Sequence, residues 1–352
     1  MKIEELMEIA CQKNASDIHL TVGLPPVLRI DGELHPLPDF PVFTETGVKE
    51  MIFSFLTEEQ KELFLANKEI DFSLAYSEKA RFRVNTYVQK GTFASSLRLI
   101  PMVIKSIDEL GLPSICHKFA QLKQGFIIVT GPTGHGKSTT LAAIINEINQ
   151  TRKCHIVTIE DPVEFIFPQG KSIVSQRELH QDTHSWEIAL RSVLREDPDV
   201  VFIGEMRDLE TITAALTVAE TGHLVFATLH TNSAALTIDR IIDVFPEDSK
   251  LQVRLQLSGV LEAVLSQRLI PSLKGGRVAA AEIMIGTSAV RTSIREGKTH
   301  MIDNIIQTSA SMGMISFESA LGKLVNEGKI SLEVAQSYAL RPEELYRLVK
   351  TK

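Results

Sequence analysis

The nine residues Gly131–Thr139, GPTGHGKST, constrain the fold of this 352-residue chain more than any other segment. They follow an apolar run, Phe126–Val129, and precede the helical pattern of Leu141–Ile145. In a strand, glycine loop and helix of this kind, backbone N–H groups and the helix N-terminus converge on phosphate oxygens. Lys137 can then reach the β- and γ-phosphates, and the Ser138 hydroxyl can ligate Mg²⁺. The segment, called the phosphate loop below, predicts a nucleoside triphosphate site. Its predicted binding residues are Gly131, Pro132, Thr133, Gly134, His135, Gly136, Lys137, Ser138 and Thr139.

Length, charge and cysteine content narrow the class of protein. A chain of 352 residues is too long for one ordinary core and predicts two domains or more. The net charge of −7 and the isoelectric point near 5.9 argue against a large basic face, and so against a helicase or DNA translocase. Three cysteines far apart in sequence indicate a reducing compartment rather than a disulfide framework. With no apolar run near the ~18 residues that span a bilayer, and no cationic leader, we expect a cytoplasmic protein.

The first hundred residues predict a small α/β domain. A turn is expected at Asp31 and Gly32, and a single helix over Ile52–Leu65. Residues 101–113 carry a proline at each end and are interpreted as the interdomain linker. The expected strands of this domain are Asp17–Val22, Val27–Ile30, Ile70–Leu74, Arg81–Val88 and Phe93–Ile100.

Residues 114–286 alternate helical patterns with fully apolar strands. This pattern is typical of a parallel sheet covered by helices on both faces, which is an α/β fold. Residues 287–352 are predicted to be helical to the end of the chain. The expected strands of the larger domain are Phe126–Val129, His155–Ile159, Val200–Ile203, Leu224–Leu229 and Ala279–Ile285.

Two acidic segments follow apolar strands of the predicted sheet. Glu160, Asp161 and Glu164 end one strand, at the sheet edge where parallel α/β proteins bind ligands. A solvated acidic turn is the alternative, but a phosphate loop in the same chain favours catalysis, because ATP hydrolysis needs a carboxylate to orient or deprotonate water. Glu205 follows Gly204, which stands where most Walker B strands carry Asp. Glu205 is therefore expected to hold Mg²⁺ or to act as the base, and both Glu164 and Glu205 are candidate bases.

Two histidines flank the strand Leu224–Leu229. His223 precedes it and His230 follows it. A single histidine is more often structural than catalytic. His230 lies at the strand end where a γ-phosphate sensor would lie, so we favour it over His223 as a functional residue.

Two groups of arginines are candidates for phosphate contacts. Arg191 and Arg195 are four residues apart, which predicts one helix face. One alternative is that they form surface ion pairs with Glu187 and Glu196, which would stabilise the fold by about 0.5 kcal/mol. The other is that they act as arginine fingers, which contact the nucleotide of a neighbouring subunit. In the small domain, guanidiniums on facing strands repel unless an anion joins them. Asp71 is the ordinary candidate for that anion, and a phosphate chain is the functional one. The arginines concerned are Arg81, Arg83 and Arg98.

Five further segments occur in a fixed order around the phosphate loop. With them, the chain resembles, over essentially its whole length, the secretion ATPases of type II secretion and type IV pili. Each segment alone is only moderately specific, whereas all five in order are very specific. The similar segments are Ala15–Leu20 (ASDIHL), Arg81–Asn85 (RFRVN), Ile159–Glu164 (the Asp box), Gly204–Asp208 (the Walker B segment) and Thr221–His230 (the His box).

Within that family, two features of the chain resemble those of the PilT-type retraction branch. The chain is too short for the extra N-terminal domain of extension ATPases, and it has no cysteine after Cys154 for their tetracysteine metal site. The segment Ala289–Lys298 resembles the AIRNLIRE motif of the branch, with Thr292 and Ser293 in place of Asn and Leu. His135 also departs from the Ser or Thr usual in the family. Because phosphates are held there by backbone N–H groups, we expect nucleotide binding to survive.

The resemblance implies a fold, an assembly and a mechanism. It implies a RecA-like ATPase domain at 114–286 joined by the linker to a PAS-like domain at 1–100, in a homohexameric ring. The ring would use ATP and Mg²⁺ and would contact the pilus platform protein at the cytoplasmic face of the inner membrane, with no direct contact to nucleic acid. Its activity would be ATP hydrolysis that drives pilus retraction and twitching motility. The alternatives are an accessory PilU-like or other secretion ATPase, and a non-motor ATP-dependent scaffold.

Specific residue roles follow as hypotheses. Glu164 would activate the attacking water, while Glu205 and Ser138 would hold Mg²⁺. Arg83 and Arg98 would touch the nucleotide phosphates, and His230 would sense the γ-phosphate. Stabilisation of the transferring phosphoryl group would come from Arg191 and Arg195.

Overall fold

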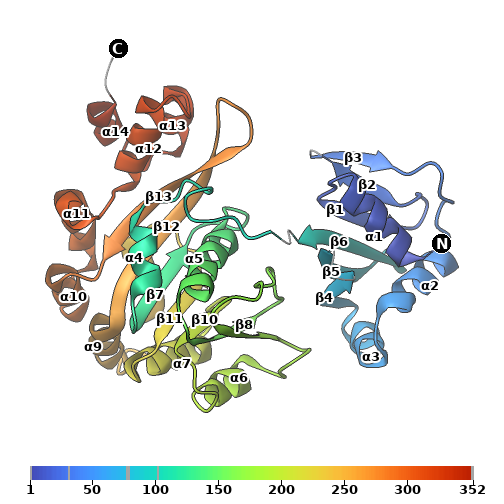
Figure 1. Cartoon of the computed structure of the whole chain (residues 1–352), viewed down its shortest axis with the longest axis horizontal. Coiled ribbons are helices and arrows are strands. Elements are labelled where there is room, and N and C mark those ends of the chain that lie inside the picture. Colours follow the sequence, from blue (N-terminus) through green and yellow to red (C-terminus); the bar gives the residue numbers. More distant parts are fainter. Residues whose placement is uncertain (1, 31, 77–79, 101–102, 350–352) are drawn as a thin grey trace. The chain divides into compact units, whose positions relative to one another are not determined.

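The computed structural model describes residues 2–30, 32–76, 80–100 and 103–349. The chain forms two compact units (Figure 1). The first comprises Met1–Val103 and Asp161–Ile166, and the second comprises Ile104–Glu160 and Phe167–Lys352. Asp31 of the expected turn and residues 101–102 of the expected linker lie outside the described residues. Across the described residues, helices that are both long enough and apolar enough to cross a membrane are absent.

The first unit is an antiparallel six-stranded sheet. Its strand order is β3-β2-β1-β6-β5-β4, and every neighbouring pair is antiparallel. The expected strands are confirmed, and the short exposed strand β3 is additional. The strands are β1 (Asp17–Thr21), β2 (Val27–Ile30), β3 (Glu33–Pro36), β4 (Glu69–Tyr76), β5 (Ala80–Gln89) and β6 (Thr92–Ile100).

Three helices pack against this sheet around one apolar core. They are α1 (Ile3–Gln12), α2 (Glu45–Phe55) and α3 (Glu58–Asn67). The expectation of a single helix over Ile52–Leu65 is wrong, because α2 ends before Thr57. The Thr57 hydroxyl accepts from Gln60 N–H while the Gln60 side chain accepts from Thr57 N–H, a capping box that starts a new helix.

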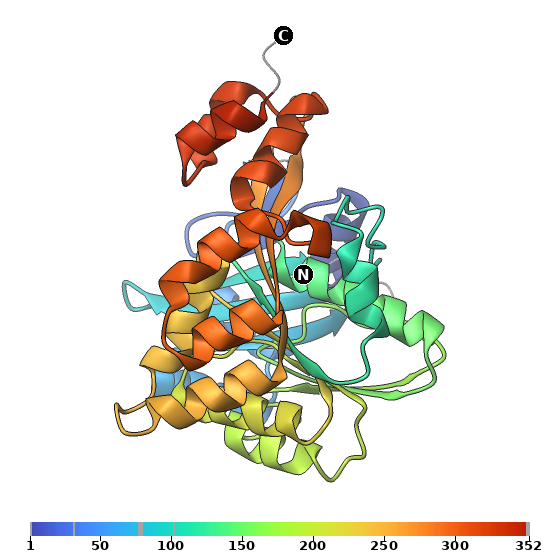
Figure 2. The same cartoon turned by 90° about the vertical axis from the view of Figure 1, so that its left-hand side faces the viewer.

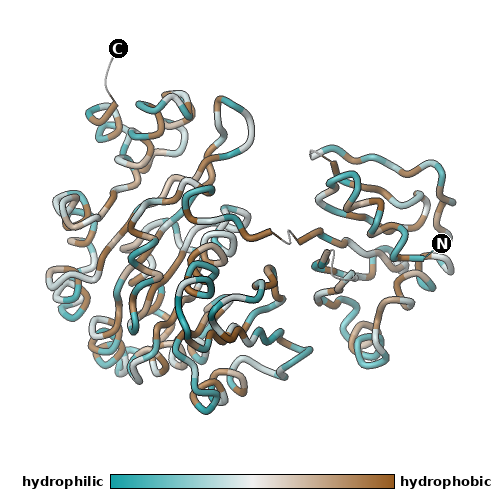
Figure 3. Tube along the Cα trace, in the orientation of Figure 1, coloured by the Kyte–Doolittle hydropathy of each residue, from teal (hydrophilic) through white to brown (hydrophobic). Residues whose placement is uncertain are grey.

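The second unit is a seven-stranded, mostly parallel sheet in the order β13-β12-β7-β11-β10-β8-β9. In Figure 3 hydrophobic stretches run along its central strands. The five expected strands are present at nearly their predicted positions. The strands are β7 (Gly125–Thr130), β8 (His155–Glu160), β9 (Ile173–Glu178), β10 (Val200–Ile203), β11 (Leu224–Leu229), β12 (Leu261–Pro271) and β13 (Arg277–Ile285).

Helices cover both faces of this sheet. One face packs against α4 (Ile115–Gln121) and α5 (Lys137–Thr151). Successive residues of the buried strands alternate between the two cores, as the pleat requires. The other face is covered by α6 (Trp186–Val193), α7 (Leu209–Glu220), α8 (Ala234–Asp243), α9 (Lys250–Val260), α10 (Ser288–Arg295) and α11 (Ile302–Thr308).

Two strands of this sheet are absent from the sequence expectations. Edge strand β9 is only partly buried and rich in polar residues. Strand β12 is parallel to β7 on one side and antiparallel to β13 on the other, so the sheet is not purely parallel. Its sequence, LEAVLSQRLIP, interrupts the apolar run with Ser266, Gln267 and Arg268, which hides it from a search for fully apolar strands.

The last three helices gather around the β12–β13 hairpin (Figure 2). They are α12 (Phe317–Asn326), α13 (Leu332–Tyr338) and α14 (Pro342–Leu348). Ile270 and Ala280 of the hairpin share a buried apolar cluster with Phe317 and Leu345 of these helices. The helical C-terminal segment therefore packs on the sheet through the two strands at its edge. Two short 3₁₀ turns, Thr299–Met301 and Ala310–Met312, complete the chain's described helical structure.

Candidate functional site

The phosphate loop begins where β7 ends and continues into α5. All six residues of β7 are buried, so the strand fixes the start of the loop within the core. Gly131 has a φ of 142°, and a Cβ there would lie 2.2 Å from the carbonyl oxygen of Gln267. Gly136 caps α5 with a φ of 81°. Glycine at both positions is required by backbone conformation and, at Gly131, also by close packing.

Lys137 lies within the loop. It is 8% exposed, and its ammonium donates to the carbonyl oxygens of Gly131 at 2.9 Å and Pro132 at 3.2 Å. A third contact reaches His230 Nδ1 at 3.3 Å. The ammonium is therefore held at the mouth of the loop, where an arriving phosphate can replace carbonyl partners as its acceptor.

His230 links the loop to the end of β10. Its Nδ1 contacts Lys137 and lies 3.4 Å from Thr133 Oγ1, while its Nε2 lies 3.1 Å from Glu205 Oε1. Because an ammonium can only donate, Nδ1 must accept, and the ring proton belongs on Nε2, where it is donated to Glu205. Lys137, His230 and Glu205 thus form one hydrogen-bonded chain across three strand ends.

Glu205 is held as an anion. Burial would raise the pKa of its carboxyl group, but the hydrogen bond and charge of Arg207, at 2.9 Å, and the contact with His230 lower that pKa below its ordinary value overall. A carboxylate of low pKa is a good cation ligand and a weak proton acceptor.

Gly204 stands where a Walker B Asp was expected, and packing explains it. A Cβ at Gly204 would lie 3.1 Å from Glu160 Cα and 3.3 Å from the Ile159 carbonyl oxygen. The carbonyl oxygen of Gly204 also accepts from the Thr228 hydroxyl. The close approach of β8 leaves little space for a side chain, so Glu205 is the carboxylate available at the end of this strand.

A chain of hydroxyl groups lies beneath the loop and was not predicted. Thr130 Oγ1 lies 2.7 Å from Thr231 Oγ1, which in turn lies 2.6 Å from Thr237 Oγ1. Thr231 N–H also donates to Thr130 Oγ1 at 2.9 Å. These bonds join the last residue of β7 to the first turn of α8, and they anchor Thr231, the residue that follows His230. Threonines are common in strands and helices alike, so the sequence carries no signal for this chain.

Strand β12 supplies further loop contacts that sequence reasoning missed. Gln267 Nε2 donates to the carbonyl oxygen of His135 at 2.9 Å, and Leu269 N–H donates to His135 Nδ1 at 3.0 Å. From β13, Arg277 donates to the carbonyl oxygen of Gly134 at 3.2 Å. Because β12 itself was not predicted, no pattern could have selected these residues.

In the first unit, a row of charged residues crosses the sheet. The strand registers place Arg83 opposite Arg98, Arg98 opposite Asp17, and Asp17 opposite Arg29, so their side chains share one face. Arg98 Nε donates to Asp17 at 2.9 Å, and Arg83 lies 3.6 Å from the Glu164 carboxylate of the same unit.

The anion expected between these arginines is therefore corrected. Asp71 lies opposite Asn85, one row along the same face from Arg83, and no ion pair between Asp71 and an arginine occurs among the described residues. Asp17 and Glu164 are the carboxylates that the structure brings to Arg98 and Arg83. Arg98 stays 71% exposed, so its guanidinium remains accessible to another anion.

Arg191 and Arg195 do not share a helix face, contrary to expectation. Helix α6 ends at Val193, and Arg195 follows in a turn. The helix cannot extend beyond Glu196, because Asp197 has a φ of 53° and precedes Pro198.

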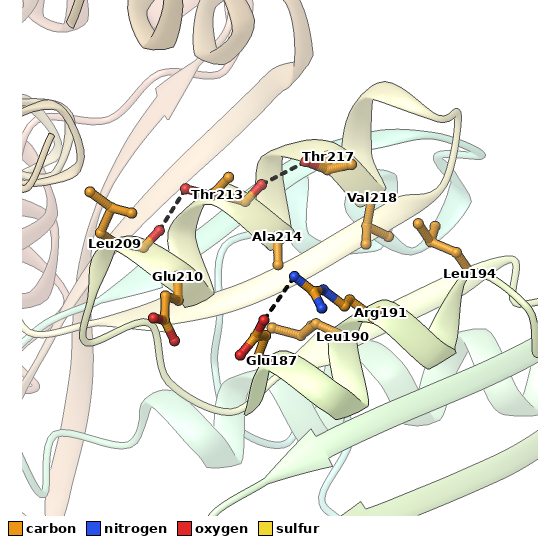
Figure 4. A pocket seen from close by; sticks show the side chains of 10 residues that line it. All are labelled: Glu187, Leu190, Arg191, Leu194, Leu209, Glu210, Thr213, Ala214, Thr217 and Val218. Atoms are coloured by element: carbon orange, nitrogen blue, oxygen red, sulfur yellow. Dashed lines mark hydrogen bonds and ion pairs between the residues drawn. The ribbon is translucent and has the colours of Figure 1, made fainter. Parts of the chain in front are cut away.

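The two arginines also differ in their partners. Arg191 pairs with Glu187 at 2.8 Å beside a pocket of about 350 Å³ between α6 and α7 (Figure 4). Glu196, the other expected partner, pairs instead with Arg177 at 2.8 Å. Arg195 is exposed, and its side chain makes no hydrogen bond or ion pair with the described residues.

The structure thus assembles one part of the predicted site. The phosphate loop, Glu205 and His230 meet in the second unit, with Ser138 half-buried at the start of α5. The tight glycine packing, the ammonium and the anionic carboxylate fit a nucleoside phosphate with a divalent cation. Glu164, Arg83 and Arg98 belong to the first unit.

Comparison with known proteins gives consistent matches. The family model described as "Type II/IV secretion system protein" matches residues 1–327. The "Type IV pilus retractation ATPase PilT" of Pseudomonas aeruginosa is 48% identical over 343 residues, covering 97% of this chain and 99% of that protein. The "Type IV pilus ATPase PilU" of the same organism is 38% identical over 351 residues, covering 99% and 92%.

A solved structure matches the fold over nearly the whole chain. It is described as the crystal structure of the pilus retraction motor PilT with bound ADP. It has a TM-score of 0.90 at 47% identity and covers 99% of each chain. The expected α/β fold class, with its N-terminal α+β unit and helical C-terminal segment, is confirmed by this match.

Proposed function

The chain belongs to the type II/IV secretion system protein family, and on that premise we propose that it is an ATPase that drives retraction of a type IV pilus. One observation carries the proposal: the 48% identity to the PilT retraction ATPase extends over nearly the full length of both chains. The cluster of Lys137, His230 and Glu205 supports it, because these are the groups that ATP hydrolysis requires around a phosphate loop.

Nucleotide binding follows from the loop itself. Its backbone N–H groups and the N-terminus of α5 receive the phosphates, and Lys137 transfers its hydrogen bonds from the loop carbonyls to phosphate oxygens. Ser138 and Glu205 would hold Mg²⁺, which supplies charge neutralisation on the phosphates when bound. His230, hydrogen-bonded to both Lys137 and Glu205, responds when either one changes partner.

The base role is proposed for Glu164. The low pKa of Glu205 suits a cation ligand better than a proton acceptor, which leaves Glu164 as the carboxylate to orient and deprotonate water. Glu164 lies beside Arg83, so the pair can exchange partners when a phosphate chain is near. Arg83 and Arg98 would then carry the state of the nucleotide to the first unit.

We further propose a homohexameric ring in which Arg191 and Arg195 act on a neighbouring subunit's nucleotide. The exposure of both side chains supports this role, because a residue that acts between subunits must be accessible in the single chain. Hydrolysis would rotate the PAS-like domain against the RecA-like domain through residues 101–113. The ring would act at the cytoplasmic face of the inner membrane by contacting the pilus platform protein.

A PilU-like accessory ATPase is the second candidate. It is favoured by the 38% identity to PilU across almost the whole chain, and it is disfavoured because the identity to PilT is ten percentage points higher over a similar length (48% against 38%). Both candidates share the loop chemistry, so only behaviour in the cell separates them.

Fluorescence imaging of labelled pili in the native host tests the proposal. Cells carrying Lys137→Ala should display abundant pili that no longer shorten, because the subunit cannot bind nucleotide phosphates. Lys153→Ala, which removes an exposed lysine of the same unit, is the matched control and should retract normally. Bald cells would instead indicate an extension motor. Normal dynamics with Lys137→Ala would indicate an accessory ATPase or a different machine.

A further inference from the structure

Strand β12 extends past the end of its parallel neighbour. The ladder between β7 and β12 ends at the pair Thr130 and Ser266, whereas β12 continues to Pro271 paired with β13. Among the described strands, none pairs with the backbone groups of Gln267–Pro271 that face away from β13. The phosphate loop occupies this position, since Gly131 approaches the Gln267 carbonyl so closely that a Cβ would lie 2.2 Å from it.

The Gln267 side chain bonds the phosphate loop with its amide nitrogen and α5 with its amide oxygen. Its amide nitrogen donates to the His135 carbonyl oxygen at 2.9 Å, and its amide oxygen accepts from Thr140 Oγ1 at 2.8 Å. Gln267 is 2% exposed and Thr140 is 1% exposed, so neither group has water as an alternative partner. One buried amide thus joins the loop to the first turn of α5, and losing it leaves a buried hydroxyl without its acceptor.

His135 makes the second connection through its side chain. Leu269 N–H is one of the β12 groups without a strand partner, and it donates to His135 Nδ1 at 3.0 Å. The imidazole therefore takes the place of a carbonyl oxygen from a missing strand. Since a backbone N–H can only donate, Nδ1 carries no proton and the ring is neutral.

The surroundings of His135 favour that neutral ring. Burial lowers the pKa of His135, and the cations around it lower that pKa further: Arg277 from β13, Arg268 from β12 and Lys137 from the loop. Arg277 also holds the neighbouring residue by donating to the Gly134 carbonyl oxygen.

We infer that Gln267 and His135 are positioning residues for the nucleotide: they hold the phosphate loop against β12 in the shape whose backbone N–H groups receive the phosphates. Neither residue needs to touch the reacting atoms, because both act on the loop backbone. The inference rests on the proposed nucleotide binding and adds the part of the fold that keeps the loop ready for it. A loop that is held in its binding shape loses less conformational freedom when the nucleotide arrives.

A pair of variants isolates the His135 contact. His135→Asn keeps an acceptor at the same number of bonds from the backbone as Nδ1, whereas His135→Leu has a similar shape without an acceptor. Binding of a fluorescent ADP analogue to the purified full chain should weaken about 3- to 10-fold in His135→Leu, the loss expected for one hydrogen bond, and His135→Asn should recover most of it. The KM for ATP should rise with the dissociation constant, while kcat changes less.

Gln267→Met removes the second contact and should weaken ADP binding in the same way. Gln252→Met and His300→Leu, both at exposed positions, are controls that should leave ADP binding unchanged. Melting temperatures identify a variant that is simply destabilised. Equal ADP affinity in His135→Leu and the parent, or equal loss in the Leu and Asn variants, would overturn the inference. Failure of the proposed function is distinct: there the parent itself would not bind ADP, or Lys137→Ala would bind it as well as the parent.

Discussion

At the scale of single residues, the two candidate bases differ in their surroundings. Glu205 is held as an anion between Arg207 and His230, and Glu164 lies beside Arg83. Glu164→Gln should reduce kcat by on the order of 10²–10³ while ATP stays bound, because a base is lost and the loop is untouched. Glu205→Gln should instead raise the Mg²⁺ concentration needed for half-maximal activity. Steady-state kinetics with a Mg²⁺ titration measures both effects. Full turnover in Glu164→Gln, with loss only in Glu205→Gln, would move the base role to Glu205.

Glu282 is a buried carboxyl group whose ionisation should lower the free energy of unfolding at alkaline pH. Burial raises its pKa to about 7, although Ala234 N–H donates to it at 2.7 Å. Its folded pKa exceeds its unfolded value, so the stability it contributes is present below about pH 4.5 and is lost as the pH rises through 7. Glu282→Gln keeps an acceptor for Ala234 and should raise the unfolding free energy at pH 8 by up to about 3 kcal/mol.

Chemical denaturation at pH 8 and pH 5.5 measures the change in Glu282→Gln, and the gain should shrink at the lower pH. Glu333→Gln, an exposed substitution on α13, should show no such difference. An equal effect of Glu282→Gln at both pH values would mean that the charge of Glu282 is not the cause.

The sequence indicates those candidate site residues whose own side chains would carry the proposed chemistry. Lys137, Glu205 and His230 follow apolar strands in register, so a parallel sheet brings them to one edge, as the structure confirms. Gln267 and Thr231 were not predicted, because their contribution is to contact the loop or the segments beside it. Their side chains are common polar types, and nothing local in the sequence distinguishes a buried glutamine that bonds the loop from an exposed one.

At the scale of secondary structure elements, His117 ties α4 to two other segments. Its Nδ1 lies 2.7 Å from Glu147 on α5, and its Nε2 lies 3.2 Å from Asp108 in the expected linker. Hydrogen bonds to Asp108 and Glu147 raise the pKa of His117. The stabilisation is therefore complete below about pH 6.5 and is lost as the pH rises through the higher folded value.

His117→Gln should lower the melting temperature by about 1–2 °C at pH 6, a small effect because the pair is near the surface. The difference from the parent should decrease at pH 9, where the parent has lost the imidazolium charge. Thermal unfolding at the two pH values gives the comparison, with His300→Gln as the exposed control. A difference that grows toward pH 9 would contradict the assigned charge.

Elements were predictable where burial left an unbroken apolar pattern. Strands β7, β10 and β11 are fully buried and were found, while β12 was missed because the same side chains that serve the loop and the C-terminal helices make it polar. Helix ends were less predictable. The break at Thr57 depends on a reciprocal capping contact, and the end of α6 depends on the backbone at Asp197, neither of which alters the hydrophobic period.

At the scale of the whole molecule, Arg191 and Arg195 could act on the nucleotide of their own subunit or on that of a neighbouring subunit. Arg195 is exposed beyond the end of α6, and Arg191 pairs with the exposed Glu187 of its own helix. A guanidinium that stabilises the transferring phosphoryl group raises kcat by about 10³-fold or more, so its loss is easily measured. In a ring with head-to-tail contacts, each nucleotide site can take its loop from one subunit and its arginine from the next.

Coexpression of two inactive variants tests whether Arg195 acts between subunits. Lys137→Ala lacks a working loop but keeps Arg195, and Arg195→Ala keeps the loop but lacks the guanidinium. If Arg195 serves the neighbouring nucleotide, about a quarter of the interfaces in randomly mixed rings combine an intact loop with an intact arginine, so ATPase activity should return well above that of either variant alone. If Arg195 serves its own subunit, no site in any mixture has both groups, and coexpression should restore nothing. A double variant carrying both substitutions, mixed with Arg195→Ala, controls for assembly, because it contributes subunits to the ring without an arginine. Recovery in that mixture too would place the rate-enhancing group elsewhere in the ring.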